Sequence, residues 1–329
     1  MNNILVTGGA GYIGSQVANL LLDRGHKVTI IDSLVTGNKK LIPKKAKFIQ
    51  CDIGNKKKIK LVLKKNNFDA VMHFAGLIKV EESFKKPKKY DLYNFKKAKI
   101  FLKTCIDNDL KTIIFSSTAS VYGETSKKKY KENSSKKPSN PYAKSKLKLE
   151  KFLIDNINKN KIKCIILRYF NVAGADKKMR GGLIDKKSSH LIKVACEVAT
   201  GKRGKLIVNG DNYNTKDGTT IRDFIHVMDL ANIHILSLGH LIKTKKSEIF
   251  NCGYGKGYSV KEVIDTANNI TNGSINYEYG DRRLGDSEVL ISDVSKLNNF
   301  INWKPKYNDL NTILKTSIDW EKKINEKNF

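Results

Sequence analysis

Two side chains that could perform acid–base chemistry, Tyr142 and Lys146, stand four residues apart near the start of a predicted helix. That spacing places both side chains on one face of the helix. An isolated tyrosine, with a pKa of about 10, is a poor base at neutral pH, and a nearby ammonium favours the phenolate. The hydroxyls of residues 116–118 end the preceding predicted strand and could share a hydrogen bond with the tyrosine and a reacting oxygen. A tyrosine and a lysine at this spacing are often an ordinary surface pair, and it is a hydroxyl among residues 116–118 that favours a catalytic set.

A glycine turn supplies a second chemical feature. Residues 4–15 read ILVTGGAGYIGS, an apolar strand followed by glycines and then by a stretch at helical spacing. Gly8, Gly11 and Gly14 have the spacing GxxGxxG, in which the backbone can approach a pyrophosphate and the helix N-terminus favours its negative charge. Glycines can also simply make a turn, but the flanking strand and helix supply the context that a dinucleotide site requires.

An acidic residue, Asp32, ends the next predicted strand, Lys27 to Ile31. A carboxylate at this place accepts hydrogen bonds from the adenosine ribose and repels a 2′-phosphate, which favours NAD over NADP. The alternative is a solvated loop aspartate without a ligand.

The elements that must position these residues alternate along the first half of the chain. Further strands are predicted at 46–50, 69–74, 111–116 and 162–169, and helices at 55–66, 90–108 and 142–160. Repeated βα units predict an α/β fold with a doubly wound parallel sheet of the Rossmann type. Ligands of such sheets lie beyond the carboxyl ends of the strands, where several distinctive residues fall. They are Gly8, Asp32, Asp52, Phe74, Ser116 and Tyr169.

The chain changes character after Phe170. An irregular segment at 171–189 precedes a predicted helix at 190–200, a strand at 206–209 and a polar loop at 212–220. A helix at 229–242 and a strand at 249–252 are expected to return to the sheet; Ser259 and Glu262 form a capping box, Asp293 caps a further helix, and the last helix covers 308–323. We therefore expect a dinucleotide-binding domain at 1–170, with returning segments near 229–255, and a smaller, discontinuous substrate-binding α/β lid domain at 171–329.

Composition narrows the classes of function. The chain has 329 residues and a formal charge of +30, which raises the question of nucleic acid. The lysines are spread through nearly every segment and their runs lack interleaved aromatic residues, so a general lysine bias explains the charge better than a nucleic-acid site. The charge should still speed the encounter with a polyanionic substrate.

Localisation is predicted from three further observations. The five cysteines are dispersed without a CxxC pair, which indicates reduced core residues rather than zinc ligands or disulfides. No apolar run is long enough to cross a bilayer, and the glycine turn begins by Gly8, where we expect no room for a signal peptide. We expect a cytoplasmic protein without a membrane partner.

Several motifs together carry a family resemblance, and they follow one another in order along the chain. They are TGGAGYIGS (7–15), HFAG (73–76), FSSTASVYG (115–123), NPYAKSK (140–146), LRYFNVAGA (167–175), DGTTIRDFIHVMDLA (217–231) and RRLGD (282–286). This set resembles UDP-glucose 4-epimerases, which belong to the extended branch of the short-chain dehydrogenases/reductases. The resemblance extends to the final helix.

The resemblance implies a hydride mechanism on permanently held NAD. Tyr142 would remove the proton of the sugar 4-hydroxyl while the C4 hydride passes to the cofactor, and the 4-keto sugar would turn before the hydride returns to its other face. Lys146 would bind the nicotinamide ribose and lower the pKa of Tyr142, and Thr118 would bridge Tyr142 and the sugar oxygen.

The resemblance also implies two sets of binding residues and no metal. Besides Gly8, Gly11, Gly14, Thr118, Tyr142 and Lys146, the NAD site would include Tyr12, Ile13, Asp32, Asp52, Ile53, Phe74, Ala75, Gly76, Asn94 and Phe170. The UDP site would include Asn171, His190, Ile207, Asn209, Arg222, Arg283 and Asp286. A guanidinium matches a diphosphate bidentately, although either arginine could instead form a surface ion pair.

The sequence departs from the family pattern at two places on the nicotinamide side. An asparagine-rich helix start is replaced by residues 93–97, YNFKK, and a lysine after the FAG turn is replaced by Ile78 beside Lys79. These departures affect individual contacts and leave the reaction class unchanged.

Two other functions are alternatives to the epimerase. A nucleotide-sugar dehydratase needs an acid and a base directly after the catalytic threonine, and here Ala119 and Ser120 follow it. A non-catalytic NAD-sensing or RNA-binding Rossmann protein commonly loses one of the catalytic pair, and this chain keeps both Tyr142 and Lys146.

Substrate range and assembly are expected by analogy. In this family a single residue, a few positions after the RxGD motif, abuts the C2 substituent of the sugar. Here that residue is Leu290. A tyrosine there goes with UDP-glucose and UDP-galactose only, whereas leucine favours acceptance of UDP-GlcNAc and UDP-GalNAc as well; the narrow range stays the alternative. Family members commonly dimerise through two long helices, for which 90–108 and 142–160 are the candidates.

Overall fold

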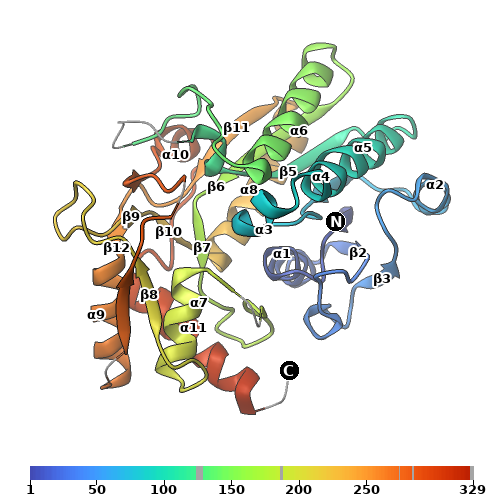
Figure 1. Cartoon of the computed structure of the whole chain (residues 1–329). Helices are drawn as coiled ribbons and strands as arrows, with labels where there is room; N and C mark the ends of the chain where they lie inside the picture. Colours follow the sequence, from blue (N-terminus) through green and yellow to red (C-terminus); the bar gives the residue numbers. More distant parts are fainter. Residues whose placement is uncertain (124–128, 186–187, 274, 284, 327–329) are drawn as a thin grey trace. The chain divides into compact units, whose positions relative to one another are not determined.

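The structure, a computed structural model, describes residues 1–123, 129–185, 188–273, 275–283 and 285–326 (Figure 1). The chain forms two compact units, each built from three segments. Unit 1 comprises Met1–Val121, Pro138–Arg168 and Ala231–Phe250, and unit 2 comprises Tyr122–Lys137, Tyr169–Leu230 and Asn251–Phe329.

A seven-stranded sheet, with strand order β11-β6-β5-β4-β1-β2-β3, is the centre of unit 1. Its strands are β1 (Asn3–Thr7), β2 (Lys27–Asp32), β3 (Lys47–Gln50), β4 (Ala70–His73), β5 (Thr112–Thr118), β6 (Lys163–Tyr169) and β11 (Glu248–Cys252). The pairings of β1 with β2 and β4, of β2 with β3, and of β4 with β5 are parallel. The predicted doubly wound sheet is confirmed, and its strand order reverses between β1 and β4, which is where such sheets bind ligands.

The sheet strands are apolar on both faces because both faces are covered. Leu5, Val71 and Phe115 belong to one core with residues of α2 (Lys56–Lys64), α5 (Ala98–Ile106) and α6 (Pro141–Asn158). Ile4 and Val6 point to the opposite face and are equally inaccessible. The other helices that contribute to unit 1 are α1 (Tyr12–Asp23), α3 (Val80–Lys85), α4 (Pro87–Tyr90) and most of α8 (Val227–Thr244).

The prediction of one regular helix at 90–108 is wrong. The chain runs from α4 into a π-helical segment, η2 (Asp91–Lys97), and only then into α5. Asn94 is buried inside this segment, and its side chain hydrogen-bonds to the backbone of Leu77 instead of facing solvent. Wide π turns of this kind are frequent at functional sites. Both η2 and α4 contact α6 (Figure 1).

Unit 2 contains small sheets and four helices among its described residues. The sheets are β12-β9-β14 (Tyr258–Ser259, Ile221–Arg222, Val289–Leu290), β13-β8 (Tyr277–Gly280, Leu206–Asn209) and β10-β7 (Phe224–His226, Asn171–Ala173). The helices are α7 (Leu191–Ala199), α9 (Val260–Thr271), α10 (Ser295–Ile301) and α11 (Leu310–Glu326). The apolar faces of α7, α9 and α11 share a core that includes Cys196, Val263 and Ile313.

Residues 122–137 belong to unit 2, although the sequence placed them in the first domain. Asn251 explains the difference, because its Nδ2 donates to the Tyr130 carbonyl (2.7 Å) and its Oδ1 accepts from the Tyr122 hydroxyl (2.5 Å). The backbone N–H of Tyr130 also donates to the carbonyl of Ile291 (2.9 Å). These long-range hydrogen bonds attach the segment to unit 2.

Helix caps and cysteines test smaller predictions. The Ser259–Glu262 capping box is confirmed. Asp293 is not the N-cap of α10, because Val294 takes that place and the Asp293 carboxylate accepts from the backbone N–H of Ser295 (3.0 Å). All five cysteines are buried, as predicted. None of the helices in the described part of the chain is long and apolar enough to cross a membrane.

Candidate active site

Tyr142 and Lys146 lie on the first two turns of α6. The helix begins at Pro141, whose fixed φ suits a first helical position, and Asn140 caps it by accepting from the Ala143 N–H (2.8 Å). The cap sets the phase of the helix, so both side chains of the catalytic pair lie on the face that contacts η2 and β5.

Lys146 is buried and its ammonium is directed at β5. Its Nζ donates to the carbonyl oxygen of Ser116 (2.9 Å) and lies 5.1 Å from the ring centroid of Phe115. Burial lowers the pKa of Lys146 to about 8, and the carboxylate of Glu150 opposes this shift. At neutral pH most of the lysine therefore keeps its proton, which it loses in the mildly alkaline range.

Tyr142 and Thr118 are brought together as predicted. Burial raises the pKa of Tyr142, and its hydrogen bond with the Thr118 side chain lowers it. Thr118, the last residue of β5, is largely buried, and its Oγ1 also donates to the Ser120 hydroxyl (3.2 Å). The lowering of the tyrosine pKa expected from Lys146 is not seen in this arrangement, because burial dominates and the ammonium bonds to the Ser116 carbonyl.

Asn94 joins three elements of the site. Its Oδ1 accepts from the Leu77 N–H (2.7 Å), and its Nδ2 donates to the Leu77 carbonyl (2.9 Å) and to Ser145 Oγ (3.2 Å). A Cβ on Gly76 would lie 3.1 Å from Asn94 Oδ1 and 3.6 Å from Lys146 Nζ. The π segment, the turn after β4 and α6 therefore meet at Asn94, and a side chain at position 76 would press against the amide.

The glycine turn forms a cradle of backbone. Gly8 has a φ of +73°, and a Cβ there would lie 2.6 Å from the backbone nitrogen of Ala75. Gly11 is the N-cap of α1, and a Cβ on Gly14 would clash with the Gly8 carbonyl. The backbone of this turn packs so closely that side chains are excluded at Gly8 and Gly14, which suits a pyrophosphate at the helix N-terminus.

Asp32 faces the same turn. Its Oδ2 accepts from the Ala10 N–H (3.0 Å) and its Oδ1 from the Leu34 N–H (2.8 Å). Burial raises the pKa of this carboxyl, and the two backbone hydrogen bonds lower it. A Cβ on Gly37 would lie 2.8 Å from Asp32 Oδ1. The carboxylate is thus fixed beside the turn, where it suits the ribose of a dinucleotide.

Asp52 has a partner that the sequence analysis missed. Its Oδ1 accepts from the Gly54 N–H (2.7 Å), and its Oδ2 accepts from Lys97 Nζ (2.5 Å). The Lys97 ammonium also lies 3.9 Å from the ring centroid of Tyr93. The only signal in the sequence was the unusual YNFKK segment, which contains both Tyr93 and Lys97.

The other residues expected to line the cofactor lie at the ends of the same strands or on α1. Ile53 follows Asp52 and is buried, and the ring of Phe74 lies 4.9 Å from that of His234 on α8. Tyr12 and Ile13 are half-buried on the first turn of α1. Phe170, in unit 2, is buried, and its N–H donates to the Cys252 carbonyl (3.0 Å).

Four predicted UDP-binding residues lie together in unit 2. Leu290 on β14 is the parallel partner of Arg222 on β9. Arg222 Nη2 lies 3.4 Å from Asp286 Oδ1, and the Asp286 N–H donates to the Arg283 carbonyl (3.2 Å). Arg283 is exposed. The Arg222 guanidinium and the Asp286 carboxylate therefore lie together, and Leu290 is the strand partner of that arginine.

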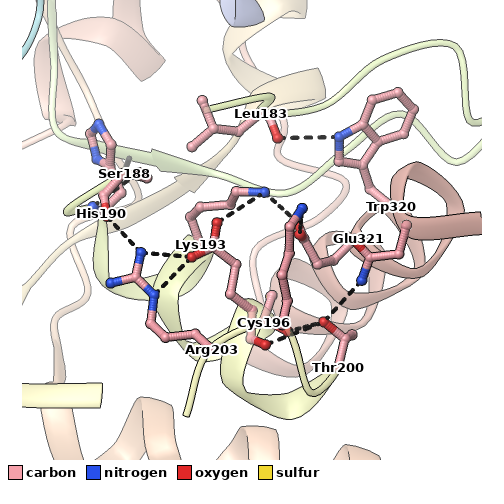
Figure 2. A network of polar contacts seen from close by, with 12 residues as sticks. Leu183, Ser188, His190, Lys193, Cys196, Thr200, Arg203, Trp320 and Glu321 are labelled. Atoms are coloured by element: carbon pink, nitrogen blue, oxygen red, sulfur yellow. Dashed lines mark hydrogen bonds and ion pairs between the residues drawn. The ribbon is translucent and has the colours of Figure 1, made fainter. Parts of the chain in front are cut away.

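The remaining predicted UDP-binding residues start from different elements of unit 2. Ile207 and Asn209 lie on β8, where Ile207 is exposed, and Asn171 begins β7 with its N–H bonded to the Asp223 carbonyl (2.9 Å). His190 is the N-cap of α7 and is exposed. Beneath it, Arg203 donates to the Ser188 carbonyl (3.4 Å) within a larger polar network (Figure 2).

Comparisons with known proteins agree with this geometry. The profile of the NAD dependent epimerase/dehydratase family matches residues 4–253. A UDP-glucose 4-epimerase of Azospirillum brasilense is 40% identical over 98% of this chain and 93% of its own length. The crystal structure of a UDP-glucose-4-epimerase from Stenotrophomonas maltophila, with bound NAD and formylated UDP-arabinopyranose, has a TM-score of 0.96 and 33% identity, covering 99% of this chain and 100% of that one.

A further solved structure bears on substrate range. The UDP-Glc/GlcNAc 4-epimerase from Campylobacter jejuni is 42% identical, has a TM-score of 0.86, and covers 98% of this chain and 100% of its own. The glycine cradle, Asp32 and the Tyr142–Thr118–Lys146 set fit the cofactor that the family name states. The chain belongs to the NAD dependent epimerase/dehydratase family and is an NAD-dependent epimerase, an isomerase.

Proposed function

We propose that this enzyme interconverts UDP-glucose and UDP-galactose by inverting the sugar at C4. The observation that carries the proposal is the hydrogen-bonded pair of Tyr142 and Thr118 at the carboxyl end of β5, one helical turn from the buried Lys146. The 40% identity to a UDP-glucose 4-epimerase over nearly the whole chain supports the choice of substrate.

The residues of this chain move and hold the proton. When bound, NAD would supply the hydride-transfer chemistry at C4 of the sugar. The Tyr142 oxygen takes the proton of the 4-hydroxyl while Thr118 orients that oxygen, which leaves a 4-keto sugar. After the sugar has turned its other face, Tyr142 gives the proton back, so no proton is gained or lost overall. Lys146 would bind the nicotinamide ribose and place positive charge in the site.

We assign NAD binding to unit 1 and to Phe170, and we keep the predicted domain of residues 1–170 with its returning segments as the cofactor domain. The glycine turn would hold the pyrophosphate and Asp32 the adenosine ribose. The proposed contacts are Gly8, Gly11, Tyr12, Ile13, Gly14, Asp32, Asp52, Ile53, Phe74, Ala75, Gly76, Asn94, Thr118, Tyr142, Lys146 and Phe170. Asp32 should exclude NADP, and equal activity of apoenzyme reconstituted with NADP would contradict that role.

We assign UDP binding to residues 171–329. Arg222 and Arg283 would bind the diphosphate, because guanidinium groups match phosphate oxygens bidentately. The other proposed contacts are Asn171, His190, Ile207, Asn209, Asp286 and Leu290. No metal is needed for this chemistry.

Acceptance of the N-acetylated pair, UDP-GlcNAc and UDP-GalNAc, is the finer part of the proposal. Leu290 lies in register with Arg222, so its side chain is placed beside a residue that is proposed to bind the diphosphate. It is half-buried and lacks the reach of an aromatic ring. The similarity to the Campylobacter jejuni enzyme, whose name states both Glc and GlcNAc, supports the wider range.

We further propose a homodimer located in the cytoplasm. Leu92 and Ile100 expose apolar side chains on η2 and α5, within the predicted dimerisation helix 90–108, and Val80 and Phe84 do so on the preceding α3. A second copy would cover this surface. Five buried, free cysteines suit a reducing compartment, and the dispersed lysines indicate no nucleic-acid partner. Sedimentation of the purified protein as a monomer would contradict the dimer.

The test of the function is turnover of four substrates side by side. Purified enzyme is incubated with UDP-glucose, UDP-galactose, UDP-GlcNAc and UDP-GalNAc, and the products are separated by chromatography. We expect equilibration within each pair without added cofactor, and release of NAD on denaturation. Protein that retains NAD but converts none of the four would overturn the proposal, and conversion of the first pair only would establish the narrow range.

A further inference from the structure

A buried carboxylate–guanidinium pair lies next to the catalytic residues and has no role in the reaction as described so far. Glu150 and Arg168 are 0% and 1% exposed. Arg168 Nε donates to Glu150 Oε1 (3.0 Å) and Nη2 donates to Oε2 (2.6 Å), which is the bidentate arrangement. Both residues lie within unit 1.

The pair is placed in line with the catalytic side chains. Tyr142, Lys146 and Glu150 follow one another at intervals of four residues on α6, so their side chains share one face of the helix. Arg168 approaches the same carboxylate from β6. Glu150 therefore lies one turn behind the ammonium of Lys146.

Glu150 also holds the end of β5. The Ser117 hydroxyl donates to Glu150 Oε1, and the neighbouring Ser116 carbonyl accepts from Lys146. Two successive residues of the strand are thus fixed by two successive turns of α6. The next residue of the strand is Thr118, which bonds to Tyr142.

The charges around Lys146 show what the carboxylate contributes. On α6 the lysine faces Tyr142 and Glu150, and from β4 it faces His73, which burial holds neutral with a pKa of about 3. Glu150 is the negative group that raises the pKa of Lys146 against its burial, and Arg168 balances Glu150. The ammonium would otherwise lie in an apolar interior beside Phe115.

We propose that Glu150 is a positioning residue of the active site: its carboxylate fixes Ser117 and thereby Thr118, and places a negative charge behind the Lys146 ammonium. The catalytic part of this inference rests on the proposed function. Arg168 permits the carboxylate to be buried, since a buried charge without a partner is strongly destabilising. A purely structural ion pair is the competing interpretation.

The test is a double variant that removes both charges while keeping polar side chains, Glu150→Gln with Arg168→Gln. The matched control is Lys193→Gln with Glu321→Gln, which neutralises a buried ion pair of unit 2 that does not touch Lys146. Thermal denaturation first establishes that both variants fold. The pH profile of kcat for UDP-galactose is then compared with that of the wild type.

We expect the Glu150/Arg168 variant to lose about tenfold in kcat, on the scale of misplaced acid–base help. Its alkaline limb should move to lower pH, because Lys146 loses the carboxylate that favours its protonated form; loss of the Arg168 charge acts in the opposite direction and limits the shift. The control should keep the wild-type limb. A folded Glu150/Arg168 variant with the wild-type kcat and the wild-type limb would overturn the proposal.

NAD retention supplies a readout that does not depend on the sugar substrate. The holoenzymes are dialysed at a series of pH values and the bound NAD is measured after denaturation. Because Lys146 is proposed to hold the nicotinamide ribose, the Glu150/Arg168 variant should lose NAD at a lower pH than the wild type and the control. If the wild type converts no UDP-sugar, the proposed function fails, whereas coincident retention curves would overturn the role of Glu150.

Discussion

The two units bury ion pairs in different ways. The Glu150–Arg168 pair of unit 1 is closed, with two parallel hydrogen bonds and almost no exposure of either partner. In unit 2, Lys193 lies between Glu321 and Glu197, and both carboxylates have a second cation (Figure 2). Those cations, Lys202 and Arg203, have side chains that are 37% and 36% exposed. We call the first the closed pair and the second the open network.

The difference concerns what happens when one member is lost. The closed pair holds β5 and α6 in one arrangement, since Glu150 bonds to Arg168 and also accepts from the Ser117 hydroxyl. The open network has surplus cations that can shift toward either carboxylate. Its contacts join α7 and α11 and reach the backbone at Ser188, next to His190. The closed pair of unit 1 thus fixes the elements that carry the proposed catalytic residues. The open network of unit 2 supports the segment that contains His190, a proposed UDP-binding residue.

The largest expected effect is that of Tyr142→Phe in unit 1. Loss of the acid–base hydroxyl should lower kcat by about 10²- to 10⁴-fold while NAD stays bound. Steady-state kinetics with UDP-galactose and quantification of bound NAD check this. Arg222→Ala in unit 2 is the contrast, and it should mainly raise KM. Near-wild-type turnover of Tyr142→Phe would remove the chemistry from unit 1.

Replacing one cation in each system compares how much stability the closed pair and the open network lose. Arg168→Met should lower the free energy of unfolding by about 3–5 kcal/mol, because Glu150 then keeps a buried and unpaired charge. Lys193→Met should cost less than about half of that, since Lys202 remains 3.2 Å from Glu321 and Arg203 remains on Glu197. Urea denaturation of both variants measures the difference. Equal losses would show that the open network does not adapt.

Substrate range tests the sheet edge of unit 2. Leu290→Tyr should reduce turnover of UDP-GlcNAc relative to UDP-glucose by about 1–3 kcal/mol in transition-state free energy, the range that a pocket wall imposes on a small added group. Ratios of kcat/KM for the two substrates measure it. Leu290→Met, which keeps the volume, is the control. An unchanged ratio in Leu290→Tyr would separate this residue from the sugar.

Each unit also contains a buried histidine that burial keeps neutral, and this gives the smallest effect. His73 in unit 1 bonds through Nδ1 to Thr7 Oγ1 (2.7 Å), and His226 in unit 2 bonds through Nε2 to Thr316 Oγ1 (3.0 Å). Burial lowers the pKa of each to about 3, from 6.5 when unperturbed. Between these values the unfolded chain binds more protons, so stability should fall as the pH falls, by about 1.4 kcal/mol per pH unit for each histidine.

His73→Asn and His226→Asn should each flatten this dependence when unfolding is followed by urea titration from pH 6 down to about pH 4. Equal flattening would show that both histidines are neutral in the folded protein. A wild-type slope in either variant would mean that this histidine is already protonated in the folded protein.

The sequence predicted the parts of the site that depend on local pattern. The parallel sheet, the glycine turn, Asp32 at a strand end, and Tyr142 and Lys146 on one helix face all follow from spacing and periodicity. Unit 2, by contrast, contains strands as short as two residues, and their pairing places Leu290 beside Arg222. Segments of that length carry no periodic signal.

Charged residues with distant partners were the other kind of miss. Glu150 and Arg168 are shielded from solvent only because α6 and β6 pack together. A glutamate on an amphipathic helix ordinarily faces water. The interval of four residues from Lys146 was visible, yet it did not indicate burial. Lys97 was likewise noted as an unusual residue, but its ion pair with Asp52 joins residues 45 positions apart.

The π segment at Asp91–Lys97 has a consequence for how this chain can change length. A π turn contains one residue more than an α turn, so deletion of a single residue there would restore regular α geometry. The helix before the deletion would then rotate by about 100° relative to α5, and the Asn94 amide would turn away from Leu77. The length of the segment is therefore fixed. We expect substitutions on its outer face to be tolerated, and insertions and deletions not to be.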